Sequence, residues 1–516
     1  MTANKIHIWL GVDVGTTGVR AIAYDVHGKN YGATEVFYPL LTPHPDEAEE
    51  DMPTIVQATQ QVIRETVAKV LPQGIEIAGL ALSTVMHSFA PLDANYEPLT
   101  PMATWADSRA VSVVRTLKED TKLCRHFYEK TCCPMHACYP LAKILHLYET
   151  HPVLFTKMQC VGSIKDVLFY QLTGEWKIDR SAASTSGLYN AHDLCWDKEI
   201  LSFAHLKEDM LPPVVSTTYQ GKLRAEVAKA LGLPEHSPVV IGATDGVLVN
   251  LGIGAVQTGQ LSATIGTSGA LRMLTPQPRT DINPHSNRTW CYNLVDGMWV
   301  AGGAINNGGM ILRWLRDNIC HFTDEKLADL DVNSYDLMTL KAAQVPAGAE
   351  GLILLPCFTG ERAPYWNSEL RGMFFGLSLK HGRSHMIRAT MEGICYSMKA
   401  VFLALQEFGT IKDIRVSGSF THSSLWLQIL ADVLGATITL PTNHEGAAFG
   451  AAILGFMAEG TWKSIADAAK LVSAKQTYMP MAENVQTYNT LYDIFASLYQ
   501  NTQKEMAAIV DYQRGL

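Results

Sequence analysis

Residues 6–24 read IHIWLGVDVGTTGVRAIAY and predict two β-strands joined by a tight turn. Ile6–Val14 is apolar and rich in β-branched residues, and Gly18–Tyr24 is a second run of the same kind. The turn between them, Gly15-Thr16-Thr17-Gly18, is built from residues that favour tight turns. A cluster of turn residues at 25–30 then leads into a third predicted strand, Tyr31–Tyr38. The chain therefore opens with an antiparallel meander.

A similar unit returns about 250 residues later. Residues 259–274 read GQLSATIGTSGALRML, which again predicts strand, glycine- and threonine-rich turn, and strand. The offset is about half of the chain, so the pattern indicates two similar domains rather than a solenoid. We expect them at 1–250 and 251–516, with a hinge near residue 250. Coincidence between two unrelated hairpins remains the alternative.

Helical periodicity fills the segments between the strands. Apolar residues recur at helical spacing in Pro53–Val70, in Met386–Leu405 and in the tail at 485–513. Ser424–Leu434 is another predicted helix, with Ser423 as its N-cap. Alternating strands and helices indicate an α/β fold.

Composition narrows the function classes. The 516 residues are 47% hydrophobic and 18% charged, which excludes global disorder. The formal net charge of −9 argues against a nucleic-acid partner. Gly246–Leu271 is uncharged, but its six glycines and several amides and hydroxyls favour a buried, turn-rich segment over a membrane span. The ten scattered cysteines form no C-x-x-C pair, and Met1–Gly11 lacks the apolar core of a signal peptide. We expect a cytoplasmic protein without a membrane partner.

Both glycine-rich turns have the chemistry of phosphate binding. In the first turn, the amides of Gly15, Thr16 and Thr17 can converge on an anion, and Arg20 can neutralise phosphate. Asp13, at the end of the preceding strand, can hold a hydrated Mg²⁺. In the second turn, Gly266 and Thr267 offer the same donors. Two such turns facing each other could hold one polyphosphate, whereas each alone could be an ordinary hairpin turn.

Asp245 directly follows the apolar run Val239–Ile241 and precedes a glycine. A carboxylate at a strand end can reach an open cleft and accept a hydroxyl proton as a general base. The alternative is an Asx-turn or a helix N-cap, a common role for a single aspartate.

Other motifs combine groups that bind a polyol or an anion. The first combination, an aromatic plane with a carboxylate and a guanidinium, is Trp105, Asp107 and Arg109. The second, a histidine after a buried strand, is Met86 and His87, and the third, a charged pair beside aromatics, is Glu361 and Arg362. A small-residue turn, Gly418-Ser419, between a predicted strand and helix lets a flat base approach the backbone. The alternatives are surface ion pairs, core aromatics and a packing turn.

Together these residues resemble the FGGY carbohydrate kinases of the actin-like ATPase superfamily, over nearly the whole chain. The most specific match is the run from Gly372-x-Phe374-x-Gly376-Leu377 to His385-Met386-x-x-Ala389-Thr390-Met391-Glu392. The resemblance implies two RNase H-like α/β domains with a catalytic cleft between them. It also implies ATP and Mg²⁺ as cofactors and closure of the cleft around ATP and sugar.

The resemblance also implies roles for single residues. Asp245 matches the catalytic base, with Asp13 and Asp245 on the metal side. The positions that match the sugar side are Met86, His87, Trp105, Asp107, Arg109, His136, Glu361 and Arg362. The positions that match the nucleotide side are Gly15, Thr16, Thr17, Arg20, Gly266, Thr267, Gly309, Arg313, Gly418, Ser419 and Ser423.

Within the family, the similarity is greatest to the bacterial members that phosphorylate gluconate. The segments that carry it include 104–109, 242–252, 264–272, 302–309 and 360–367. It implies ATP-dependent phosphorylation of D-gluconate at its C6 hydroxyl, with sugar acid and ATP as partners and a homodimer as one compatible assembly. Arg109, Arg362, His87 and His136 are the candidates for holding the substrate carboxylate, and the sequence does not rank them. The alternatives are a kinase for a neutral sugar such as xylulose or glycerol, an ATP-driven switch and, more remotely, a DNA-binding regulator.

Overall fold

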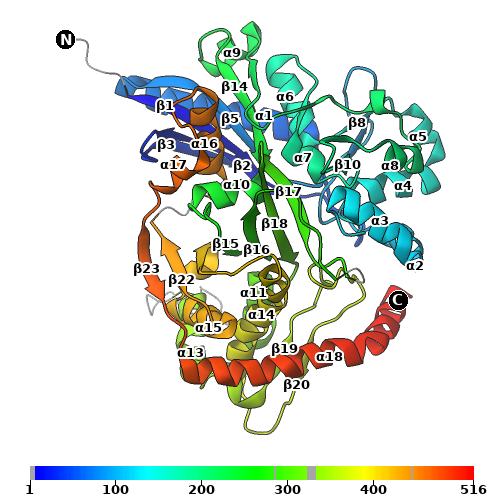
Figure 1. The fold of residues 1–516 in the computed structure, drawn as a ribbon, viewed down its shortest axis with the longest axis vertical. Coiled ribbons are helices and arrows are strands. Elements are labelled where there is room, and N and C mark those ends of the chain that lie inside the picture. Colours follow the sequence, from blue (N-terminus) through cyan, green and yellow to red (C-terminus); the bar gives the residue numbers. More distant parts are fainter. Residues whose placement is uncertain (1–5, 284–285, 322–332, 443–445, 516) are drawn as a thin grey trace.

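The chain folds around two β-sheets, each covered by helices, in an α/β arrangement (Figure 1). The computed structural model describes residues 6–283, 286–321, 333–442 and 446–515. The N-terminal half supplies the sheet in the upper part of Figure 1, and the C-terminal half supplies the sheet in the lower part.

The first sheet has six strands in the order β13-β14-β5-β1-β2-β3. Their bounds are β1 His7–Val14, β2 Gly18–Asp25, β3 Asn30–Phe37, β5 Glu76–Thr84, β13 Gln220–Lys222 and β14 Pro238–Thr244. The predicted opening meander is confirmed, because β1 pairs antiparallel with β2, and β2 pairs antiparallel with β3. β5 lies parallel to β1 on its other side, and β14 is parallel to β5.

The second sheet has seven strands in the order β17-β18-β16-β15-β21-β22-β23. Their bounds are β15 Gln260–Ile265, β16 Gly269–Thr275, β17 Trp290–Val295, β18 Met298–Ile305, β21 Asp413–Ser417, β22 Ile438–Pro441 and β23 Ala474–Tyr478. β15 and β16 form the predicted second hairpin, and β18 pairs antiparallel with β16. β21 is parallel to β15, and β22 is parallel to β21.

The internal repeat predicted from the two turns is present in the topology. The series β3-β2-β1-β5-β14 of the first sheet and β18-β16-β15-β21-β22 of the second share the same strand order and the same pattern of antiparallel and parallel pairs. Because the two Gly/Thr turns occupy equivalent positions in these series, they present equivalent backbone groups at the edge where each sheet carries its site residues.

The helices of the N-terminal half are α1 Met52–Val70, α2 Val111–Glu119, α3 Thr121–Thr131, α4 Pro140–Thr150, α5 Pro152–Lys157, α6 Ile164–Thr173, α7 Arg180–Ser184, α8 Lys198–Phe203, α9 Ala225–Leu231 and α10 Asp245–Gly252. Those of the C-terminal half are α11 Gly309–Leu315, α13 Ser334–Ala343, α14 Arg383–Gln406, α15 Ser424–Leu434, α16 Gly446–Ala458, α17 Ile465–Ala469 and α18 Ala482–Arg514. α1 packs on β2 and β3, and α14 packs on β16 and β18. Among these residues, no helix combines the length and apolar character needed to cross a membrane.

Short strands complete the structure outside the two sheets. They are β4 Glu49–Glu50, β6 Ala90–Leu92, β7 Met102–Ala103, β8 Cys160–Gly162, β9 Ile178–Asp179, β10 Tyr189–Asn190, β11 Cys195–Trp196, β12 Val214–Val215, β19 Ile353–Leu355 and β20 Met373–Phe375. Single helical turns add η1 Leu71–Gln73, η2 Glu208–Met210, η3 Arg316–Cys320, η5 Ala349–Gly351 and η6 Ser419–His422. Each of the ten cysteines lies in the described part of the chain and carries a free thiol.

α16 belongs to the C-terminal half of the sequence but packs on the first sheet, beside α10 (Figure 1). Glycines allow this close packing. A Cβ atom on Gly11 would lie 2.0 Å from the Ala448 carbonyl oxygen, and one on Gly450 would lie 2.3 Å from that of Leu248. No side chain fits such gaps without moving the backbone. The two halves are therefore joined along a glycine-lined contact as well as through the chain near residue 250.

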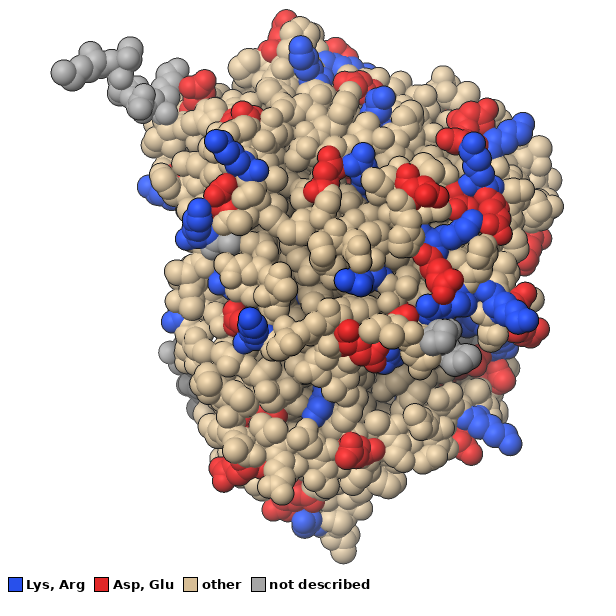
Figure 2. All heavy atoms as spheres, in the orientation of Figure 1, with Lys and Arg blue, Asp and Glu red and all other residues tan. Residues whose placement is uncertain are grey.

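Charged side chains of both signs are interspersed over the face shown in Figure 2. Pairs such as Arg125 with Glu129 (2.7 Å) and Arg316 with Asp317 (2.6 Å) illustrate this local neutralisation. Surface pairs of this kind contribute little to stability. The groups that matter for chemistry lie instead in the cleft between the two sheets.

Candidate active site

The first glycine-rich turn joins β1 to β2 at the cleft. Asp13 and Arg20 are paired residues of the hairpin, and Arg20 Nε donates to Asp13 Oδ2 (3.3 Å). Ser83, at the end of β5, donates to the other carboxylate oxygen of Asp13 (2.7 Å). The turn closes with a hydrogen bond from the Gly15 amide to the Gly18 carbonyl (2.9 Å). Neighbouring strand ends therefore fix the orientation of the Asp13 carboxylate.

The second turn joins β15 to β16 and is tied to the start of α11. The Gly309 amide donates to the Gly266 carbonyl (2.7 Å), and the Met310 amide donates to the Thr267 carbonyl (3.2 Å). A Cβ atom on Gly309 would lie only 2.7 Å from the Gly266 oxygen, so this approach requires glycine. A Cβ atom on Gly266 would meet nothing within 4 Å, because that position faces open space.

Thr16 of the first turn and all four residues of the second turn, 266–269, line one cavity of about 280 Å³. The first sheet and its connections contribute residues from the turn, from the end of β5, and from the loop after β7. The second sheet and its connections contribute the opposite wall. The sequence-predicted residues that this cavity brings together are Thr16, Met86, His87, Trp105, Asp245, Gly266, Thr267 and Arg362. Residues up to 346 positions apart in the chain thus meet in one space.

Asp245 is the first residue of α10, directly after β14, so it lies at the end of a parallel strand. Its Oδ1 accepts a hydrogen bond from the Gly246 amide (2.6 Å). Burial, and next the negative charge of Asp13, raise the pKa of Asp245 to about 7, against the effects of that amide, Arg272 and Lys165. A carboxylate whose pKa lies near neutrality is suited to general-base chemistry. The N-cap of α10 is Thr244, so the alternative role of Asp245 as a helix N-cap is wrong.

Lys165 contacts the end of β14 and is fully buried. Its Nζ donates to the carbonyl oxygens of Ile241 (2.7 Å) and Ala243 (3.1 Å), and it lies 3.6 Å from the Asp179 carboxylate. The lysine thereby secures the end of β14, from which Asp245 projects. Sequence reasoning did not identify it, because a lysine in a helix is more often exposed.

Asp13 and Asp245 form the only acidic pair that sequence reasoning assigned to a metal. Their mutual repulsion, visible in the raised pKa of Asp245, is what a bound divalent cation would relieve. Hard carboxylate oxygens also suit Mg²⁺. Within the described residues there is no cluster of three or more His, Cys, Asp or Glu side chains placed to hold a metal. The remaining ligands of a cation here would therefore come from nucleotide and water.

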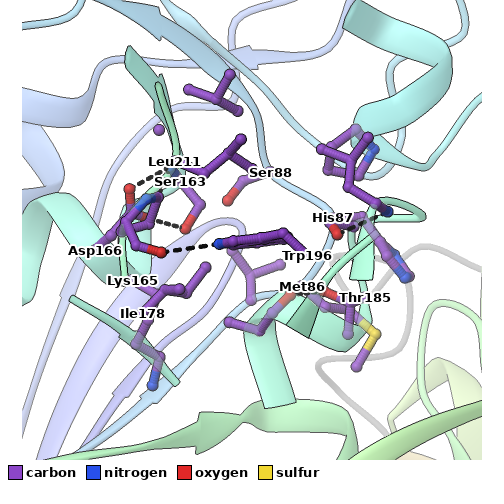
Figure 3. Close-up of a pocket in the computed structure, with 18 residues that line it drawn as sticks. Met86, His87, Ser88, Ser163, Lys165, Asp166, Ile178, Thr185, Trp196 and Leu211 are labelled. Carbon is purple, nitrogen blue, oxygen red and sulfur yellow. Dashed lines mark hydrogen bonds between the residues drawn. The ribbon is translucent and has the colours of Figure 1, made fainter. Parts of the chain in front are cut away.

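Met86 and His87 follow β5 and separate the cleft from a smaller cavity of about 40 Å³ (Figure 3). His87 Nε2 hydrogen-bonds the Tyr292 hydroxyl (3.1 Å), and the His87 carbonyl accepts from Lys143 Nζ (2.7 Å). Burial, followed by the positive charges of Lys143 and Arg362, lowers the pKa of His87 well below its usual value. His87 is therefore neutral at physiological pH and offers hydrogen bonding rather than charge.

His136 does not line the cleft cavity. Its ring packs edge-on against Trp366 (5.3 Å between ring centres), a residue that does line the cavity. Its Nδ1 accepts a hydrogen bond from the Cys138 amide (3.2 Å). Burial, and then the charges of Lys118 and Arg362, lower the pKa of His136 well below its usual value. It therefore contributes no charge to the sugar side.

Glu361 and Arg362 are adjacent in the sequence, but only the Arg362 side chain lines the cleft cavity. Glu361 is buried, and its carboxylate accepts from the Asn307 amide group (3.2 Å) and from the Arg362 backbone amide (3.0 Å). Arg362 reaches the cavity, with its guanidinium 4.8 Å from the Trp105 ring centre and its Nε donating to Asn306 Oδ1 (2.7 Å). Glu361 thus orders the loop, and Arg362 presents its charge to the cleft.

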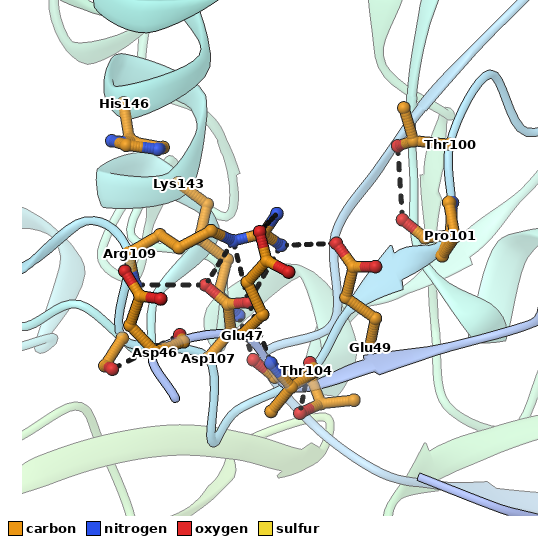
Figure 4. A network of polar contacts seen from close by, with 12 residues as sticks. Asp46, Glu47, Glu49, Thr100, Pro101, Thr104, Asp107, Arg109, Lys143 and His146 are labelled. Atoms are coloured by element: carbon orange, nitrogen blue, oxygen red, sulfur yellow. Dashed lines mark hydrogen bonds and ion pairs between the residues drawn. The ribbon is translucent and has the colours of Figure 1, made fainter. Parts of the chain in front are cut away.

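Asp107 and Arg109 lie outside the cleft cavity and line a separate cavity of about 250 Å³. The Arg109 guanidinium lies among three carboxylates, with Nη2 2.7 Å from Glu49, Nη2 2.8 Å from Asp107 and Nη1 3.5 Å from Glu47 (Figure 4). The Ala48 amide donates to Asp107 (3.1 Å). This arginine is therefore neutralised by the chain itself. Trp105, from the same motif, does face the cleft, and its Nε1 donates to Thr16 (2.9 Å).

Four residues predicted for the nucleotide side, Arg313, Gly418, Ser419 and Ser423, do not line the cleft cavity. Gly418 has a φ of +99°, and a Cβ atom there would lie 2.5 Å from the Ile265 carbonyl oxygen. Ser419 begins η6 and is exposed, as is Arg313 on α11. Ser423 caps α15 by accepting from the Trp426 amide (3.2 Å), as predicted from sequence. The hydrogen bond confirms Ser423 as the helix cap, and its contact with the nucleotide stays a prediction.

Arg272 on β16 lines the cavity and was not among the sequence candidates. Arg272 lies in the segment 264–272, which is one of those that carry the family resemblance. The neighbouring residues of a strand, however, do not show which face of the sheet an arginine side chain occupies. The structure settles this, because Arg272 Nη1 donates to Thr264 Oγ1 on the cleft side of β15 (3.3 Å).

Comparisons with known proteins agree with this geometry. The family model for the N-terminal domain of the FGGY family of carbohydrate kinases matches residues 8–252, and the C-terminal model matches residues 261–459. The chain is 37% identical over 513 residues to a gluconokinase of Bacillus subtilis (strain 168), covering 98% of each chain. A crystal structure of gluconate kinase from Lactobacillus acidophilus superposes with a TM-score of 0.89 at 30% identity, covering 98% of this chain and 99% of that one. A ligand-bound xylulose kinase from the same organism gives a TM-score of 0.88, also at 30% identity, covering 96% and 98%.

Proposed function

The chain belongs to the FGGY family of carbohydrate kinases, and from this membership we propose that it transfers the γ-phosphoryl group of ATP to the C6 hydroxyl of D-gluconate, giving 6-phosphogluconate. One observation carries the proposal: Asp245 and both glycine-rich turns line a single cavity that also holds a free cationic side chain, Arg362. The gluconokinase at 37% identity supports gluconate as the substrate over xylulose.

Asp245 acts as the general base in this proposal. It orients the C6 hydroxyl and accepts its proton as the oxygen attacks the γ-phosphorus. Phosphoryl transfer needs little covalent assistance, so the protein acts mainly by positioning and electrostatics. The turns at 15–18 and 266–269 supply backbone and hydroxyl donors to the phosphates, with Arg20 nearby. Asp13 and Asp245 are the residues that would hold Mg²⁺, which when bound neutralises charge on the nucleotide phosphates.

The substrate carboxylate must find a cation, because burying an unpaired anion is costly. Arg109 is already neutralised by Glu47, Glu49 and Asp107. Arg362, by contrast, has no acidic side chain within ion-pair distance in the described part of the chain, and it faces the cavity. We therefore assign the carboxylate to Arg362, with neutral His87 as a neighbouring hydrogen-bonding group.

The remaining assignments form part of the same proposal. Gly309 and Gly418 lie against the second turn, and together with Arg313, Ser419 and Ser423 they would contact the nucleotide beyond the γ-phosphate. With a domain division near residue 250, most sugar contacts would come from the first half and most nucleotide contacts from the second. Consumption of ATP favours the cytoplasm as the working compartment.

The test is a coupled assay of ADP release with Mg²⁺-ATP and gluconate, xylulose, glycerol or no sugar, on the wild type and on Arg362→Gln. We expect turnover with gluconate alone. In Arg362→Gln we expect the KM for gluconate to rise at least about tenfold, because a charge-assisted bond is lost. Turnover confined to a neutral sugar would refute the gluconate assignment, and sugar-independent ADP release would favour an ATP-driven switch.

A further inference from the structure

Arg272 occupies a position in the cleft that none of the roles above explains. It lies on β16, opposite Ser262 of β15 and Gly302 of β18. Its side chain crosses toward the first half of the chain, since a Cβ atom built on Gly246 would lie 3.8 Å from Arg272 Nε. Nη1 of the same guanidinium donates to Thr264 Oγ1 (3.3 Å). The guanidinium therefore lies between the residue next to the proposed base and the strand that leads into the second phosphate turn.

This cation is incompletely satisfied by the protein. Nε is buried and has no hydrogen-bond partner among the residues that the structure describes. No carboxylate of the described chain lies within ion-pair distance of its guanidinium, although Asp245 is near enough to favour its charged form. Burial lowers the pKa of Arg272 to about 10, which still leaves it protonated at neutral pH. Arg272 is partly exposed to the cavity, and its buried Nε without a partner is costly, so its position favours an anionic ligand.

Two anions can enter the cavity under the proposed function: the γ-phosphoryl group and the substrate carboxylate. The hydroxyl that attacks must lie at Asp245, and the phosphates must lie at the turn that follows Thr264. The group being transferred passes between these two points. Arg272 lies beside both of them, whereas Arg362 lies over the Trp105 ring.

We propose that Arg272 is a catalytic residue that contacts the γ-phosphoryl group of ATP and stabilises it during transfer. The inference rests on the proposed kinase function but not on gluconate being the sugar. In the step, the C6 oxygen forms a bond to the γ-phosphorus, and the bond from that phosphorus to the β,γ-bridging oxygen breaks. Asp245 takes the hydroxyl proton, and ADP leaves with the bridging oxygen and its electron pair. Arg272 exchanges no proton and supplies positive charge to the oxygens of the moving group.

The same position can also serve as a switch for closure. Arg272 comes from the second sheet and reaches Gly246 of the first half, so a γ-phosphate held by it would draw both walls of the cleft onto the nucleotide. ADP lacks this group and would not engage the arginine. The inference therefore predicts that Arg272 distinguishes a nucleoside triphosphate from a diphosphate in the absence of any sugar.

The experiment compares wild type, Arg272→Gln, Arg272→Lys and Arg362→Gln. Calorimetric titration with Mg²⁺-ADP and with a non-hydrolysable Mg²⁺-ATP analogue measures the preference for a γ-phosphate. Steady-state kinetics use gluconate, or whichever sugar the wild type phosphorylates. Thermal unfolding of each variant reports whether it is folded, and Arg272→Lys keeps the charge where glutamine does not.

We expect Arg272→Gln to lower kcat by about 100-fold or more, with the KM for the sugar changed by less than about threefold. Its affinity for the triphosphate analogue should fall at least about tenfold while its affinity for ADP stays unchanged, and Arg272→Lys should recover part of both losses. Arg362→Gln should keep the triphosphate preference. The inference is overturned if Arg272→Gln keeps that preference, or if it raises the KM for gluconate with kcat unchanged, which would make Arg272 the carboxylate ligand. Absence of gluconate turnover in the wild type would refute the substrate, and it would leave the nucleotide titration to decide the role of Arg272.

Discussion

The raised pKa of Asp245 predicts how the reaction depends on pH. As the proposed general base, Asp245 would act only in its ionised form. Burial and the charge of Asp13 raise its pKa to about 7, so the residue binds a proton as the pH falls through neutrality. The Asp245 carboxyl would be ionised in about nine-tenths of the molecules at pH 8 and in about one-tenth at pH 6. We expect kcat/KM for Mg²⁺-ATP to fall about tenfold between pH 8 and pH 6, since this parameter reports the enzyme before the nucleotide and its cation bind.

The cause of the shift can be tested separately from the shift itself. In Asp13→Asn the neighbouring negative charge is gone, so the pKa of Asp245 should fall and the acid limb of the profile should move to lower pH. The absolute rate should also fall, because Asp13 is a proposed metal ligand, but the position of the limb does not depend on the rate. Asp317→Asn serves as the matched control, since Asp317 pairs with Arg316 on the surface away from the cleft.

The assay measures 6-phosphogluconate directly while Mg²⁺-ATP is varied at constant gluconate, so that no coupling enzyme adds its own pH dependence. Thermal unfolding at pH 6 and pH 8 checks that each variant stays folded. A rate that is flat between pH 8 and pH 6 would refute the assignment of Asp245 as a base with a near-neutral pKa. An acid limb that stays in place in Asp13→Asn would show that repulsion by Asp13 does not contribute to it.

Two further predictions concern packing and the second cavity. Gly11→Ala would place a Cβ atom 2.0 Å from the Ala448 carbonyl, so we expect a loss of about 1–3 kcal/mol and a Tm lower by several degrees. Gly515→Ala, whose Cβ atom would come no closer than 3.6 Å to another atom at a φ of −81°, should change little. Equal Tm values for these two variants would contradict the close contact between β1 and α16. Arg109→Gln should also lower the Tm, by about 2–6 °C, because three carboxylates lose their cation, but it should leave the KM for gluconate within about twofold of wild type. A KM increase of tenfold or more would place Arg109 on the substrate after all.

Local sequence was sufficient for the elements and for part of the site. The alternation of apolar residues and the glycine-rich turns determine the hairpins β1–β2 and β15–β16, because strand and turn preferences act over a few neighbouring residues. The same holds for the start of α15 at Ser423, where the serine hydroxyl accepts a hydrogen bond from the backbone amide of Trp426, three residues further along. The position of Asp245 at the end of the sheet could be predicted because a carboxylate directly after a buried strand must emerge there.

The choice among the arginines could not be made in this way. Arg109, Arg272 and Arg362 carry the same charge, and each lies in a segment that was a reasonable part of a site. Arg109 is neutralised by Glu47 and Glu49, some 60 residues earlier, and Arg272 faces the cleft because of the register between β16, β15 and β18. Charge tells which ligand a side chain can bind, but only the three-dimensional neighbours tell whether the protein has already satisfied it.

The sequence by itself determined the repeated strand–turn–strand units, the α/β class and the position of an aspartate at the end of β14, because these depend on short-range preferences. The tertiary structure alone decided that α16 returns to pack on the first sheet, that the two turns share one cavity, and which cations remain available there. These features depend on contacts between residues hundreds of positions apart, and short-range preferences contain no information about such contacts.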